Sequence, residues 1–82
     1  MSEEAKNFFE EQREKLGLTA TQMAARVPVS SDSVRDWEAD GAVPRPPIAA
    51  LAKAYQVSEQ RMEKEVMALR RRLEAKRAAL AG

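Results

Sequence analysis

The stretch that decides the fold runs from Thr19 to Glu38 and reads TATQMAARVPVSSDSVRDWE. Thr19 can begin a helix, because its hydroxyl can accept a backbone N–H that has no partner inside the helix. Gln22, three residues later, can complete a capping box. Ser30 begins a second helix in the same way. Only residues 26–29 separate the two helices, so the stretch predicts a helix-turn-helix, and the rest of the chain must supply its other walls.

Three further helices are expected around this unit. The first starts at Ser2, with Glu3 and Glu4 in its positive first turn, and ends at Gly17. A fourth starts at Pro46 and Pro47, where a missing N–H costs nothing, and its stripe reaches Tyr55. A fifth is capped by Ser58 and runs to about Ala81, because no Gly or Pro interrupts it. No segment shows the alternation of a β-strand, so the chain is expected to be all-α.

A core can be assigned from apolar residues at helical spacing. Trp37 is its largest member and is expected to pack against the first and fourth helices. The other inward-facing residues are expected to be Phe8, Phe9, Leu16, Met23, Ala24, Val27, Val34, Ile48, Leu51, Ala52 and Tyr55.

Length and composition limit the class of protein. The chain has 82 residues, which is one small domain, and it has no Cys and no His. The usual thiolate nucleophile, general base and zinc ligands are therefore missing, and we expect no enzyme, no metal and no cofactor. No run of about 18 apolar residues exists and no secretory pattern opens the chain, so a cytoplasmic location without membrane association is expected.

The charge is unevenly distributed. Up to Ser58 there are nine acidic residues against seven basic ones, a net charge of −2. After Ser58 there are four acidic residues against seven basic ones, a net charge of +3. Because positive charge attracts phosphate, the tail is a candidate contact for DNA or for an acidic partner protein.

Taken in order, these features resemble the Cro and phage-repressor family of helix-turn-helix proteins, often called XRE-type. The resemblance covers about residues 6–62 and rests on Arg13, Leu16-Gly17-Leu18-Thr19, Met23-Ala24, Val29-Ser30, Val34, Trp37-Glu38, Pro44, Leu51-Ala52 and Val57-Ser58. It implies a five-helix, lambda-repressor-like domain at residues 1–62 and an extended C-terminal helix at residues 63–82. It also implies a dimeric transcriptional regulator, with a repressor as the expectation, whose third helix enters the major groove of operator DNA.

The resemblance also implies roles for particular residues. Arg13 and Glu38 match an ion pair that ties the first helix to the third. Thr19 matches a phosphate contact, and Arg45 lies in a loop that reaches the DNA backbone. The exposed face of the third helix, which would read the bases, carries Ser31, Asp32, Ser33, Arg35 and Asp36.

The net charge of −2 up to Ser58 and two departures from the family pattern, Ala20 and the two acids of the third helix, keep a rival open. Ala20 stands where the family usually has Gln, and Asp40 stands where Gly is common. Asp32 and Asp36 place two acids on the helix that should approach a polyanion, although Asp can accept a hydrogen bond from cytosine. The rival is a protein-interaction module, such as an antitoxin or anti-repressor subunit, with little DNA reading of its own.

A second resemblance, to MerR-type regulators, rests on LTATQMA, VSSDSVRDWE and GAVPRP. Those proteins place the motif at the N-terminus and follow it with a two-stranded wing. A preceding helix and the absence of strand signals favour the five-helix alternative. Both alternatives imply DNA binding.

The last helix shows a short heptad pattern. Its apolar positions are Met62, Val66, Leu69, Leu73 and Leu80, and Lys76 takes the remaining one. Leu69, Leu73 and Leu80 are expected to find no wall within their own chain, so Val66, Leu69, Leu73 and Leu80 predict a homodimer seam. The charge pairs expected across that seam do not decide the relative orientation of the two C-terminal helices.

Overall fold

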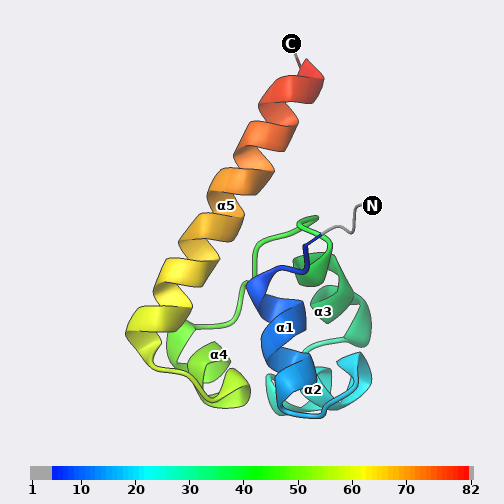
Figure 1. The fold of residues 1–82 in the computed structure, drawn as a ribbon, viewed down its shortest axis with the longest axis vertical. Coiled ribbons are helices and arrows are strands. Elements are labelled where there is room, and N and C mark those ends of the chain that lie inside the picture. The colour runs from blue at the N-terminus through cyan, green and yellow to red at the C-terminus, as the bar shows by residue number, and fades with distance from the viewer. Residues whose placement is uncertain (1–4, 82) are drawn as a thin grey trace.

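The computed structural model describes residues 5–81, which form five α-helices and no strand. They are α1 (Phe8–Lys15), α2 (Ala20–Arg26), α3 (Ser31–Glu38), α4 (Ile48–Tyr55) and α5 (Glu59–Ala81). The first four pack into a compact body, and α5 runs along one side and projects beyond it (Figure 1). Because no strand occurs among the described residues, there is no wing, and the five-helix alternative is confirmed.

The caps of the helix-turn-helix follow the sequence prediction. The Thr19 hydroxyl accepts the Gln22 N–H at 3.1 Å, and the Gln22 side chain accepts the Thr19 N–H at 2.8 Å. The Ser30 hydroxyl accepts the Ser33 N–H at 3.2 Å. Both helices therefore begin where the sequence places them.

The predicted start of the first helix was wrong. Residues 5–7 are not helical, and α1 begins after Asn7, whose side chain accepts the Glu10 N–H at 3.1 Å. The Asn7 amide also donates to the Trp37 carbonyl at 2.8 Å, which ties the N-cap to the end of α3. The proposed cap at Ser2 lies outside the described residues.

The other helix ends need small adjustments. Gly17 has φ +73° and ends α1, as predicted. Pro47 is the N-cap of α4, so both prolines precede the helix instead of lying in its first turn. Gln56 takes a left-handed conformation with φ +57°, which turns the chain back so that α5 can pack against α4.

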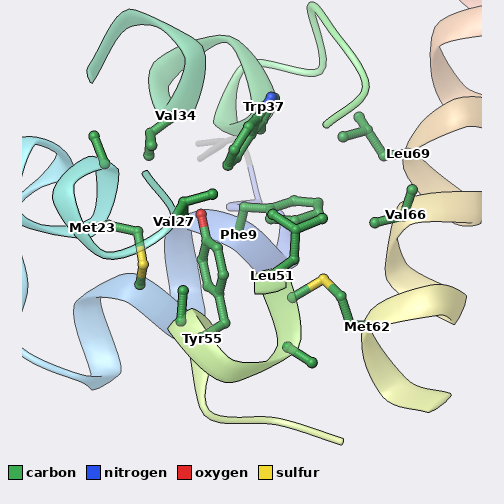
Figure 2. Packing of buried hydrophobic residues seen from close by; sticks show 13 residues of the cluster. Phe9, Met23, Val27, Val34, Trp37, Leu51, Tyr55, Met62, Val66 and Leu69 are labelled. Carbon is green, nitrogen blue, oxygen red and sulfur yellow. The ribbon is translucent and has the colours of Figure 1, made fainter. Parts of the chain in front are cut away.

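The core lies between all five helices, each of which contributes buried side chains. The side chains of Phe9, Tyr55 and Leu51 are completely buried, and Trp37 is 3% exposed. The Phe9 ring meets Tyr55 edge-on with centroids 5.6 Å apart and lies 6.2 Å from the Trp37 ring, which favours rigid packing (Figure 2).

The expectation that Leu69 and Leu73 lack a wall within the chain was wrong. Leu69 is 0% exposed, Val66 6% and Leu73 8%. Figure 2 shows Val66 and Leu69 pointing from α5 toward Phe9 and Trp37. These side chains cover the open side of the four-helix body, and so they cannot also form a seam with a second copy.

The packed unit therefore continues past residue 62, where the sequence analysis placed the end of the domain. Only the last part of α5 stands clear of the body: residues 77–81, which follow Lys76, are all exposed, and Leu80 is 82% exposed. None of the helices in the described part of the chain is long and apolar enough to cross a membrane.

Candidate nucleic-acid interface

The outer surface of α3 is polar and open to solvent. Successive residues of a helix are rotated by about 100°, so burial of Val34 and Trp37 turns residues 32, 35 and 36 outward. Asp32, Arg35 and Asp36 are exposed, and Ser31 and Ser33 are half-buried at the two edges. The structure thus brings together all five residues that the sequence assigns to base reading.

One edge of this surface is occupied by its own hydrogen bonds. The Arg35 guanidinium donates to the Ser31 hydroxyl at 3.2 Å and to the Asp32 carboxylate at 3.3 Å. The Asp32 side chain is 91% exposed and that of Arg35 59%, so water screens this pair strongly. Arg35 is therefore held lightly and can exchange these partners for a DNA group.

The other edge opens onto a groove between α3 and the loop that follows it. The groove has a volume of about 310 Å³, and its polar lining includes Ser33, Asp36 and Arg45. Val43 and Pro46 form part of its apolar wall. Arg45 is exposed there, so the loop places a cation beside the acidic edge of α3.

Thr19 lies exposed at the start of α2. Its oxygen accepts the Gln22 N–H, which leaves the hydroxyl proton free to donate. Ala20 is half-buried and packs against the edge of the core. Ala at that position therefore contributes packing and offers no side-chain hydrogen bond.

Comparison with known proteins agrees with this architecture. A family model described as a helix-turn-helix domain matches residues 7–64, most of the chain. The protein belongs to the helix-turn-helix domain family. No curated protein matches it, and no solved structure matches it. Membership in this family points to DNA binding, and the family match is consistent with the XRE-type resemblance.

In this helix-turn-helix protein, α1 holds α3 in place. Arg13 forms a two-pronged ion pair with Glu38, from Nε to Oε2 at 2.6 Å and from Nη2 to Oε1 at 2.9 Å. The two side chains are only 15% and 10% exposed. Hydrogen bonding to Glu38 raises the pKa of Arg13. Arg13 also donates to the Leu18 carbonyl at 2.9 Å, so one side chain joins α1, α3 and the segment before α2.

A second polar junction escaped the sequence analysis. Asp40, with φ +56°, accepts hydrogen bonds on one carboxylate oxygen from Asn7 at 3.0 Å and from Arg72 at 3.1 Å. Lys76 donates to the Asp40 carbonyl at 3.4 Å. The available signal was Asp40 itself at a position where the family favours Gly, because Asp tolerates the left-handed conformation and adds a carboxylate.

The basic residues near the end of α5 therefore fall into two groups. Arg72 and Lys76 face the helix-turn-helix body and dock α5 through Asp40. Arg70, Arg71 and Arg77 are exposed, and none of them forms an ion pair with another residue in the range 5–81. Within that same range, no group of three acidic side chains is arranged to hold a metal ion.

Proposed function

We propose that this protein is a sequence-specific DNA-binding transcriptional regulator, and that it acts as a repressor by placing α3 in the major groove of an operator. The observation that carries the proposal is the outward surface of α3. It is polar and exposed, and it shares a groove with Arg45 of the following loop. An α-helix with such a surface fits the width of the major groove.

We assign roles by position on this surface. Ser31, Asp32, Ser33, Arg35 and Asp36 read base edges. Thr19 and Arg45 contact phosphates and position α3, because such contacts orient a protein without carrying sequence information.

The protein is further proposed to bind its operator as a homodimer. Since Val66, Leu69 and Leu73 are buried within one chain, the large apolar side chains that remain exposed among the described residues are Met67 and Leu80, and we assign pairing to the projecting end of α5 with Leu80. One exposed leucine supplies far less area than the about 1,200–2,000 Å² of a stable interface. We therefore expect the dimer to be weak in solution and to form on DNA, where two half-sites hold the copies together.

Selection of bound sites from a random duplex pool tests this function. The expected outcome is an enriched inverted repeat, and Leu80→Glu should reduce affinity for the full repeat more than for a single half-site. A matched exposed control is Ala79→Glu, which lies on another side of α5. Failure to enrich any sequence would contradict the proposed function.

A second candidate is a protein-interaction module that has kept the fold without reading DNA. It is favoured by the bond between Arg35 and Asp32, which uses part of the positive charge on α3. In this case the exposed basic side chains of α5 hold an acidic partner protein. Retention on random duplex DNA across a salt series separates the two: affinity that falls steeply with salt supports DNA binding, and no retention even at low salt supports the module.

A further inference from the structure

The two acids on the recognition surface differ in their surroundings. Asp32 is bonded to Arg35 along the helix. Asp36 has no cationic partner anywhere in residues 5–81, although it lines the same groove as Arg45. The carboxylate of Asp36 is therefore the acceptor on this surface that remains free.

A free carboxylate opposes binding to DNA unless it meets a hydrogen-bond donor there. It faces a polyanion, and losing water without a replacement bond is costly. The major groove offers two donors, cytosine N4 and adenine N6. The adenine donor stands beside the N7 acceptor, which repels a carboxylate, whereas cytosine presents only its donor.

We infer that Asp36 is a specificity-determining residue that selects cytosine at one position of each half-site, with Arg45 balancing its charge against the neighbouring phosphate. The inference rests on the proposed function, because it assumes that α3 enters the major groove. Arg45 is suited to this task since it lies across the groove from α3 and is exposed. Asp36 thus contributes selectivity, and Arg45 restores the attraction that the acid removes.

Removing the charge of Asp36 should change the affinity for the selected site and the affinity for random DNA in opposite directions. Asp36→Ala removes both the cytosine contact and the repulsion of phosphate. Affinity for the selected site should fall about tenfold, in line with the loss of one good base contact. Affinity for random duplex should rise. An acid that merely points into solvent would instead increase affinity for both DNAs alike, and that result would overturn the inference.

The base preference itself is tested by repeating the random-pool selection with Asp36→Asn. The amide has nearly the same shape, and Asn pairs with adenine through N6 and N7. Wild type should prefer cytosine at one position per half-site, and Asp36→Asn should prefer adenine there. Asp32→Asn, the matched control on the same helix, should leave cytosine in place at that position.

These selections distinguish a failure of the proposed function from a failure of the inference about Asp36. If wild type enriches no sequence, the proposed function fails and the inference fails with it. If wild type enriches a repeat and Asp36→Asn enriches the same bases at every position, only the inference is overturned. Circular dichroism of each variant confirms that the exposed substitutions leave the helices intact.

Discussion

The hydroxyl of Tyr55 is buried in the core without a hydrogen-bond partner among the described residues. An unsatisfied buried polar group costs about 1–3 kcal/mol, so removing it should not destabilise the fold. We expect Tyr55→Phe to unfold at the same temperature as wild type or higher. Trp37→Ala, which empties a large buried site, should cost about 3–5 kcal/mol. Equal losses in thermal denaturation would contradict this view of the core.

Tyr55 also makes the fold less stable at alkaline pH. Burial raises the pKa of its hydroxyl far above the usual value. Above about pH 10 the unfolded chain releases a proton that the folded chain keeps, so the free energy of unfolding falls as pH rises. Urea denaturation at pH 8 and pH 11 should show a smaller decrease for Tyr55→Phe than for wild type. Parallel decreases would mean that the hydroxyl is not buried.

Arg35 and Arg45 separate base reading from phosphate contact. Arg35→Ala should weaken binding to the selected site by about 1–3 kcal/mol and relax its base preference. Arg45→Ala should weaken binding to all duplexes and reduce the salt slope by about one unit. Both are measured by fluorescence anisotropy over a range of salt concentrations. If Arg35→Ala weakens all sequences equally, Arg35 belongs with the phosphate contacts.

The helix α5 is attached to the four-helix body through Asp40. Burial alone would raise the pKa of Asp40, but hydrogen bonds from Arg72 and Asn7 outweigh it and hold the pKa below its usual value. The junction therefore adds stability above about pH 4, the range of an unfolded aspartate, and loses it as pH falls through the folded pKa.

Asp40→Asn tests this junction. It keeps an oxygen for Asn7 and removes the charge that attracts Arg72. Because the Arg72 side chain is 40% exposed, the loss at pH 7 should be modest, about 1 kcal/mol or less. The difference in the free energy of unfolding between variant and wild type, measured by urea denaturation, should become smaller toward pH 3. A constant gap would assign the effect to something other than the carboxylate charge.

Shortening α5 tests how far the packed unit extends. A chain that ends after Glu65 loses the buried residues Val66, Leu69 and Leu73, the first two of which belong to the core cluster of Phe9 and Trp37. Losing several large buried side chains can exceed the about 5–15 kcal/mol available to a small domain. A chain that ends after Lys76 keeps these residues and the bonds to Asp40. We expect the longer chain to melt cooperatively and the shorter one to lose its cooperative transition. Equal melting would contradict the packing of α5.

Sequence patterns predicted most of the elements but less of their arrangement. The caps at Thr19 and Ser30 depend on neighbouring residues, and so local sequence was sufficient for them. The start of α1 was misjudged although Asn7 caps Glu10 within the local sequence, while its bonds to Trp37 and Asp40, which are distant in sequence, lay beyond any local pattern. Heptad spacing in α5 predicts an apolar stripe but not the surface that covers it, and the covering surface proved to be the chain itself.

At the scale of the whole molecule, two charged regions compete for the role of DNA contact. One is the face of α3 with Thr19 and Arg45, and the other is the exposed set Arg70, Arg71 and Arg77 on α5. In Figure 1 the C-terminal end of α5, which carries Arg77, projects beyond the body that contains α3, whereas Arg70 and Arg71 lie next to Arg72, which bonds Asp40. Because only the first region includes the helix proposed to enter the major groove, a single copy is expected to contact a half-site mainly through it.

Mapping of backbone amide shifts on addition of a selected duplex tests this claim most directly. ¹⁵N-labelled protein is titrated with one half-site, and the perturbed amides are located on the structure. The largest changes are expected at Thr19, at residues 31–36 and at Arg45, while residues 70–77 change little. Changes centred on residues 70–77, with α3 undisturbed, would contradict it.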